Sequence, residues 1–186
     1  MAWEADFLNS MSSLRSPVMD KIMWFFSVIG NGGILPIGLT ILLLIFVKTR
    51  KIGVEALISL LLTFIIANLI IKHAVGRVRP YEAYTYLESL IGKMSDTSFP
   101  SGHAANTFAV AIAILINNRK IGIPVTIVAV IMAFSRMYNV VHYPTDVLAG
   151  IFIGTTVAIA VHFALKRFVY GRILQTSNDQ QEASDK

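Results

Sequence analysis

Three short clusters of polar residues carry the side chains that can do chemistry in this chain. Lys72 and Arg79 stand seven residues apart, and a Pro-Ser-Gly-His sequence ends at His103. The third cluster consists of Arg136, His142 and Asp146. Three cations suit a doubly charged tetrahedral anion, because arginine donates paired hydrogen bonds to phosphate oxygens. The clusters therefore indicate a phosphate-binding site.

Backbone donors are expected to complete this phosphate site. Ser101 and Gly102 stand directly before a long apolar run and are predicted to lie at the N-terminus of a helix. Unpaired N–H groups and the helix dipole favour a bound anion there, and glycine lets the anion approach the backbone closely. The predicted phosphate ligands are Lys72, Arg79, Ser101, Gly102 and Arg136.

The histidines and the aspartate supply the predicted catalytic groups. Pro144 is expected to begin the last helix, with His142 just before it and Asp146 in its first turn. Asp146 can accept the Nδ1–H of His142 and leave Nε2 free to attack phosphorus, as in a triad whose nucleophile is histidine. His103 can protonate the leaving oxygen as the general acid. Arg77 is expected at most to attract anionic head groups.

The composition predicts an all-α integral membrane protein. Of the 186 residues 55% are hydrophobic, the mean hydropathy is +0.65, and the charges gather in short patches between apolar runs. The absence of cysteine excludes disulfides and cysteine-based metal sites. The net charge of +5 comes mainly from basic residues that flank apolar runs, which favours a membrane topology signal over a nucleic-acid partner.

Three regions are predicted along the chain. Residues 1–16 are expected to form a short amphipathic helix in the membrane interface, residues 17–170 a six-helix membrane phosphatase domain, and residues 171–186 a polar cytoplasmic tail. Two apolar stretches of about 20 Å each flank the glycines at 30–33, at ~1.5 Å per residue. We favour two short spans for residues 18–47, and one kinked span stays open.

The basic loops predict the orientation of these spans. Lys48 to Lys51, Arg119-Lys120 and Lys166-Arg167 fall on one side if the spans alternate. That side is expected to be cytoplasmic, because positive residues accumulate there. The three polar clusters then share the extracytoplasmic face, and both termini are predicted to be cytoplasmic.

Taken in order, the clusters resemble the signature of the type 2 phosphatidic acid phosphatase superfamily. The matching parts are Lys72-x₆-Arg79-Pro80, Pro100-Ser101-Gly102-His103 and Ser135-Arg136-x₅-His142-x₃-Asp146. The chain most resembles the bacterial phosphatidylglycerophosphate and undecaprenyl diphosphate phosphatases of this superfamily. The resemblance implies a six-helix membrane core, a phosphohistidine intermediate on His142, and no metal or other cofactor. Asp146 is the one acid assigned to the site, so no carboxylate cluster for Mg²⁺ is expected.

The predicted function is a lipid phosphate phosphatase at the outer membrane face. Phosphatidylglycerophosphate is the first expected substrate, and undecaprenyl diphosphate in cell-wall lipid recycling is the alternative. The expected partners are a phospholipid or polyprenyl phosphate and the bilayer, without nucleic acid or an obligate protein partner. A lipid or anion transporter is a hypothesis from a different class, but the charges lie at one membrane edge and no internal repeat is visible. The membrane spans argue against a haloperoxidase.

Overall fold

The structure is a computed structural model that describes residues 2–170, and this part of the chain is helical without a β-strand. The predicted tail, 171–186, lies outside the described residues. The elements are α1 (Ala2–Ser13), α2 (Pro17–Ile29), η1 (Asn31–Gly33), α3 (Ile34–Ile45), α4 (Arg50–Thr63), the π-helical η2 (Phe64–Ile71), α5 (Lys72–Val75), α6 (Pro80–Ala83), α7 (Gly102–Asn117), α8 (Arg119–Tyr138), α9 (Pro144–Leu165) and the π-helical η3 (Lys166–Tyr170). The all-α prediction is confirmed.

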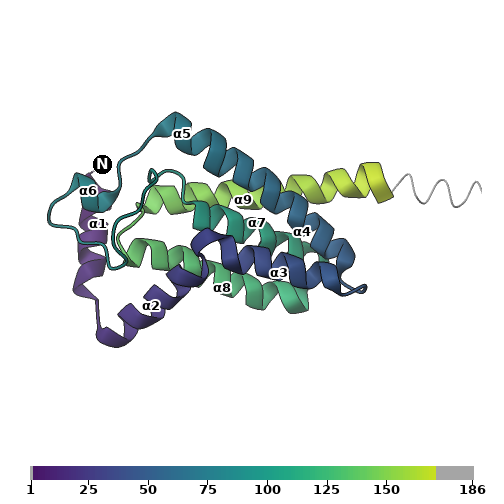
Figure 1. The fold of residues 1–186 in the computed structure, drawn as a ribbon, viewed down its shortest axis with the longest axis horizontal. Helices are drawn as coiled ribbons and strands as arrows, with labels where there is room; N and C mark the ends of the chain where they lie inside the picture. Colours follow the sequence, from purple (N-terminus) through teal and green to yellow (C-terminus); the bar gives the residue numbers. More distant parts are fainter. Residues whose placement is uncertain (1, 171–186) are drawn as a thin grey trace, which may run out of the picture.

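Helix α7 lies in the middle of the bundle, where it packs against α3, α4, α8 and α9. Helices α1, α5 and α6 lie at one end of the molecule, and the C-terminal end of α9 lies at the other (Figure 1). Two helix starts follow the predicted signals, since Pro144 begins α9 and α7 begins at Gly102. Helix α2 begins in the same way, with the Ser16 hydroxyl as its cap ahead of Pro17.

The described helices leave the predicted number of six membrane crossings unconfirmed. Within the described residues, three helical segments are long and apolar enough to cross a membrane: 50–83, 119–138 and 144–168. Helices α2 and α3 qualify together as a fourth, bent span. Helix α7 is apolar but has 16 residues, which is short for a crossing. Six spans therefore remain a prediction.

The chain bends but does not reverse between α2 and α3. The two helices meet at an angle of 53°, and Gly32 and Gly33 take φ values of 60° and 75° in the left-handed region. This geometry favours one broken span over the two short spans predicted. Because the chain continues in much the same direction, α1 lies at the opposite end of the bundle from the C-terminal end of α9 (Figure 1). The prediction that both termini are cytoplasmic stays a prediction.

Helix α1 has one buried face and one exposed face, and large apolar side chains lie on both of them. Ala5 and Leu8 are fully buried and pack against Leu87, Val140 and Tyr143. The large side chains of the opposite face, Trp3 and Phe7, are exposed. The buried face of α1 thus covers the connection between α8 and α9. Its predicted place in the membrane interface stays a prediction.

Small residues let α9 approach α7 closely. A Cβ atom at Gly150 would come within 2.5 Å of the Ser101 carbonyl oxygen, and one at Gly154 within 2.2 Å of the Ala105 carbonyl oxygen. Such glycine contacts are typical of helix pairs in membranes, where close van der Waals packing drives association. The approach also allows the Ser101 N–H to donate to the backbone oxygen of Asp146 at 3.0 Å. The packing of α7 on α9 thus joins two of the polar clusters.

We predict that Gly154→Ala lowers the thermal unfolding midpoint, because the new methyl group must push α9 away from α7. Overpacking of this kind typically costs about 1–3 kcal/mol. Gly38→Ala is the matched control, since a Cβ atom there meets nothing within 4 Å and alanine favours the helix. Thermal unfolding in detergent micelles measures both variants. Equal midpoints for the two would contradict the packing argument.

Candidate active site

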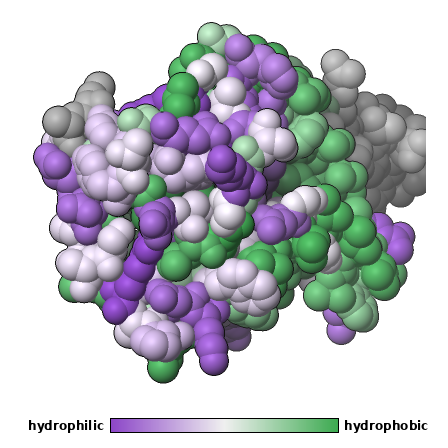
Figure 2. Space-filling view, turned by 60° about the vertical axis from the view of Figure 1, so that its left-hand side comes forward, coloured by the Kyte–Doolittle hydropathy of each residue, from purple (hydrophilic) through white to green (hydrophobic). Residues whose placement is uncertain are grey.

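A cavity of about 800 Å³ brings the predicted clusters together. Six of the eight predicted site residues line it: Lys72, Arg79, Gly102, His103, Arg136 and His142. Ser101 and Asp146 lie behind its wall, where the Ser101 hydroxyl caps α7 by accepting from the Ala104 N–H. Hydrophilic residues gather over this end of the molecule, and hydrophobic residues cover the flank beyond it (Figure 2).

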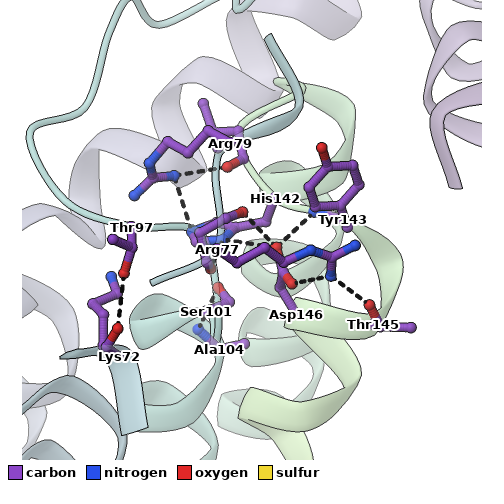
Figure 3. A network of polar contacts seen from close by, with 12 residues as sticks. Lys72, Arg77, Arg79, Thr97, Ser101, Ala104, His142, Tyr143, Thr145 and Asp146 are labelled. Atoms are coloured by element: carbon purple, nitrogen blue, oxygen red, sulfur yellow. Dashed lines mark hydrogen bonds and ion pairs between the residues drawn. The ribbon is translucent and has the colours of Figure 1, made fainter. Parts of the chain in front are cut away.

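Lys72 and Arg79 meet at the carboxylate of Asp96. The Lys72 ammonium forms an ion pair with Asp96 Oδ2, and Arg79 Nη2 donates to Oδ1 at 2.5 Å. Arg79 is further fixed by bonds to the backbone oxygens of Asp96 at 2.8 Å and Val141 at 2.7 Å. The side chain is 2% exposed, so its direction is set by the protein. Figure 3 shows Arg79 above His142.

Lys72 and Arg79 do not lie on one continuous helix, although they stand seven residues apart. Helix α5 ends at Val75, and Gly76 follows in the left-handed region with φ 60°. Arg79 is extended and precedes the short helix α6. The two cations therefore converge because the helix ends and the backbone turns at Gly76. Two turns of one helix do not bring them together.

Arg136 is the least neutralised cation in the cavity. Its side chain is buried, and Nη1 donates to the hydroxyl of Ser27 on α2. Among the described residues, Arg136 forms no ion pair with a carboxylate, and its Nε has no hydrogen-bond partner. A buried guanidinium in this state favours an anion in the adjoining cavity.

His142 is held by a backbone oxygen, which differs from the predicted contact. Its Nδ1 lies 2.7 Å from the Ser98 carbonyl oxygen and 3.7 Å from Asp146 Oδ2. Asp146 Oδ2 already accepts from the Ser98 hydroxyl at 2.5 Å and the Tyr143 N–H at 3.0 Å. The Ser98 carbonyl thus fixes the tautomer with the proton on Nδ1. Nε2 then carries the lone pair, 3.5 Å from Arg79 Nη1.

The surroundings of His142 keep its ring neutral. Burial lowers its pKa, and the charges of Arg136 and Arg79 lower it further, while Asp146 partly opposes them. The resulting pKa is about 4. At neutral pH the Nε2 atom of the imidazole is therefore unprotonated, as a nucleophile requires.

His103 projects from the first turn of α7 into the cavity. Its Nε2 lies 3.1 Å from the Asn31 side-chain oxygen on η1. Gly30 leaves room for the ring, because a Cβ atom there would come within 2.4 Å of His103 Cδ2. The break between α2 and α3 thus shapes one wall of the site and supplies a polar partner for this histidine.

Asp96 is a site residue that sequence reasoning missed. Burial raises the pKa of this carboxyl group, but the hydrogen bond from Lys72 and the charges of Lys72 and Arg79 outweigh it and lower the pKa to about 2. Asp96 stands in the irregular segment 84–101, where no periodicity marks it. The usable signal was indirect, since two cations buried together need an anion nearby.

The donor set of the cavity suits an anion better than a metal ion. Within residues 2–170 no group of three or more histidine, aspartate or glutamate side chains can hold a metal. Protein cations surround the space instead, and such cations can neutralise the charge of a phosphoryl group. Independence from metal remains a prediction.

We predict that Asp96→Asn strengthens inhibition by inorganic phosphate, because the Asp96 carboxylate occupies Lys72 and Arg79 and competes with phosphate. A gain of 1.4 kcal/mol would lower the inhibition constant about tenfold. Since a pKa near 2 keeps Asp96 ionised, the difference should be the same from pH 5 to pH 8. Hydrolysis of an aryl phosphate at graded phosphate concentrations measures it.

Glu82→Gln is the control for the Asp96 experiment, since it removes an equal charge from an exposed position on α6. Its inhibition constant should stay at the wild-type value. Weaker phosphate inhibition in Asp96→Asn would mean that the carboxylate organises the cations for phosphate and does not compete with it.

Comparison with known proteins places these features in a family context. Residues 53–170 match the PAP2 superfamily. An undecaprenyl-diphosphatase of Sulfolobus acidocaldarius is 36% identical over 126 residues, which cover 66% of this chain and 59% of that protein. The undecaprenyl-diphosphatase BcrC of Bacillus subtilis is 40% identical over 107 residues, which cover 55% and 53%. The matches thus span between half and two thirds of the length of these curated relatives.

Two solved structures share the fold. A transmembrane PAP2 type phosphatidylglycerolphosphate phosphatase of Bacillus subtilis superposes with a TM-score of 0.72 and 22% identity, covering 90% of this chain and 86% of that one. Aquifex aeolicus LpxE superposes with a TM-score of 0.74 and 25% identity, covering 84% and 92%. Because the sequence match covers more than half of the chain and contains all three polar clusters, this protein belongs to the PAP2 superfamily.

Proposed function

We propose that this protein is a membrane lipid phosphatase that removes the terminal phosphate of a polyprenyl diphosphate. The observation that carries the proposal is the composition of the cavity lining, which contains both buried cations and many apolar side chains. One part of the lining consists of Lys72, Arg79 and Arg136, and another part consists of apolar side chains of α3, α4 and η2. Those apolar residues are Pro36, Ile37, Ile41, Leu44, Leu57, Leu60, Leu61 and Phe64. A substrate with a phosphate head and a hydrocarbon tail matches both parts.

In the proposed reaction, Nε2 of His142 attacks phosphorus and the bond from phosphorus to the leaving oxygen breaks. His103 donates a proton to that oxygen, and a phosphohistidine remains on His142. Water then attacks phosphorus while His103 takes up a proton, so that phosphate leaves and both histidines return to their first state. The cations Lys72, Arg79 and Arg136 offset the charge on the phosphoryl oxygens, with Gly102 at the helix N-terminus beside them.

The relatives guide the choice of substrate. The sequence analysis put phosphatidylglycerophosphate first, but two relatives at 36% and 40% identity are named undecaprenyl-diphosphatases. We therefore favour a polyprenyl diphosphate, whose leaving group is the polyprenyl monophosphate. A monophosphate is also a better leaving group than an alcohol, because its oxygen is less basic.

Phosphatidylglycerophosphate remains the second candidate because of two asparagines. Asn68 precedes Lys72 by one helical turn, Asn106 follows His103 by one turn, and both line the cavity. The Oδ1 atom of each is buried without a hydrogen-bond partner within residues 2–170. The glycerol hydroxyl next to the scissile phosphate of phosphatidylglycerophosphate can donate to such oxygens. A diphosphate has no such donor and would instead accept from the amide nitrogens.

We also propose that the active site faces the extracytoplasmic side. The loops that carry Lys48 to Lys51 and Arg119-Lys120 lie at the end of the bundle opposite the N-terminal ends of α7 and α9 (Figure 1), and positive loops favour the cytoplasm. In this orientation α1 lies on the extracytoplasmic side, where the sequence analysis had not expected the N-terminal segment.

We predict that the wild-type protein releases phosphate from undecaprenyl diphosphate in detergent–lipid micelles that contain EDTA. His142→Ala should lower the rate by a factor on the order of 10⁴, because the nucleophile is gone. His73→Ala is the matched control, since His73 is exposed and bonds to the backbone of its own helix. Phosphate release also has to be measured with phosphatidylglycerophosphate and phosphatidate. No release from any lipid by folded wild-type protein would overturn the proposal.

We predict that Asn106→Asp separates the two candidate substrates. The new carboxylate still accepts from a hydroxyl group, but it repels the second phosphate of a diphosphate. Activity on undecaprenyl diphosphate should therefore fall at least about tenfold, and activity on phosphatidylglycerophosphate should fall less. Asn117→Asp, at the other end of α7, serves as the control. Equal losses on both lipids would show that Asn106 does not contact the leaving group.

A further inference from the structure

Arg77 forms a network of buried polar contacts beside the cavity, although it does not line it. Its Nη1 donates to Asp146 Oδ1 at 2.6 Å and to the Thr145 hydroxyl at 2.8 Å. Its Nη2 donates to Glu4 Oε2 at 2.6 Å, and its guanidinium lies 3.8 Å from the centre of the Tyr143 ring. Figure 3 shows the guanidinium between Asp146 and Thr145. Arg77 therefore joins the start of α9 to the N-terminal helix α1.

Two routes lead from Arg77 to His142. The side-chain route runs through Asp146, whose other oxygen accepts from the hydroxyl of Ser98 at 2.5 Å. The backbone route is shorter: the carbonyl oxygen of Arg77 accepts from the Ser98 N–H at 2.7 Å, and the Ser98 carbonyl oxygen holds His142 Nδ1 at 2.7 Å. The position of the Ser98 carbonyl, and with it the direction of the His142 ring, thus depends on both ends of Arg77.

Glu4 provides the second charge that Arg77 needs to stay in place. Glu4 and Asp146 are both fully buried, so Arg77 faces two carboxylates that water cannot solvate. Glu4 Oε1 also accepts from the N–H and the hydroxyl of Thr145, at 3.2 and 2.6 Å. These contacts hold Thr145 at the first turn of α9, next to Asp146. Glu4 lies outside the residues that match the PAP2 superfamily, which begin at 53.

We propose that Arg77 is a positioning residue for the nucleophile and that Glu4, from the N-terminal helix, completes this function. The inference rests on the proposed function, because it concerns how well His142 attacks phosphorus. Arg77 has no contact with the cavity, so it acts on the orientation of His142 and not on substrate binding.

The charges predict that one substitution has opposite effects in two backgrounds. In the wild-type protein, Glu4→Gln removes a partner of Arg77 and should lower kcat a few-fold. In Arg77→Gln, two buried carboxylates face each other without a cation, which strongly disfavours the ionised forms. Adding Glu4→Gln to Arg77→Gln removes one of these carboxylates and should raise kcat. A double-mutant cycle isolates this coupling.

The experiment measures kcat and KM with undecaprenyl diphosphate for the wild-type protein, the two single variants and the double variant. We expect Arg77→Gln to lower kcat about 100-fold and to change KM less than about threefold, since it removes orientation and not uniform binding. We expect the double variant to exceed Arg77→Gln in kcat about fivefold, because a positive coupling of this size is usual for charges in contact. Lys72→Gln, which alters the cavity itself, should raise KM and provides the contrast.

Folding and orientation are separated by two further measurements. Thermal unfolding midpoints report stability, and activity is expressed per folded molecule. If the kcat loss of the double variant equals the product of the losses in Glu4→Gln and Arg77→Gln, the proposal is overturned. A rise in KM without a loss of kcat in Arg77→Gln would also overturn it. If the wild-type protein releases no phosphate from any lipid, the proposed function fails instead.

Orthovanadate then tests the inference in the absence of lipid turnover, because vanadium accepts a fifth ligand from an oriented imidazole nitrogen. Calorimetric titration should show weaker vanadate binding in Arg77→Gln and recovery in the double variant. Sulfate, which stays four-coordinate, should bind equally to all four proteins. Equal vanadate affinity in the wild-type protein and Arg77→Gln would overturn the positioning role.

Discussion

Three cations buried around one cavity form the constraint on which the rest of the structure depends. Lys72, Arg79 and Arg136 are 8%, 2% and 1% exposed, and such charges repel one another when water is excluded. Asp96 is the one carboxylate that pairs with them among the described residues, and it binds two of the three. The cavity therefore keeps a formal excess of two positive charges while His103 and His142 are both neutral. A phosphate dianion would offset this excess, so the protein's own electrostatics favour the proposed substrate.

The same constraint explains why the loop before α7 is well fixed although it has no regular structure. Ser98 in this loop bonds to three parts of the site through its N–H, its hydroxyl and its carbonyl oxygen; the partners are Arg77, Asp146 and His142. Asp96, two residues earlier, holds the two cations from α5 and the chain before α6. One short segment thus sets both the charge distribution of the cavity and the tautomer of His142. The two functions are coupled because they share a backbone.

Local sequence signals predicted part of the structure, but they could not predict contacts between residues that are far apart in the sequence. Capping serine and proline residues mark where α2, α7 and α9 begin, and the order of the three clusters predicted that they converge. Asp96 and Glu4 were missed because their partners stand 24 and 73 positions away, and helical periodicity relates only close neighbours. The glycines at 30–33 marked a break, but its 53° angle depends on how α2 packs against α8. The predictions for the number of spans and for the side of the N-terminus both depend on that one angle.

The N-terminus of α7 links phosphate binding to recognition of the leaving group. A Cβ atom at Gly102 would come within 2.9 Å of Asn68 Oδ1, so glycine there lets the asparagine lie directly beside the phosphate cage. Asn106 lies one turn further along α7, on the way to the apolar part of the cavity. In the proposed function the same cations bind the phosphate of every substrate, whereas the two asparagines would contact only the atoms next to the scissile phosphate. Substrate choice in this architecture can therefore change at the asparagine positions while Lys72, Arg79 and His142 stay as they are.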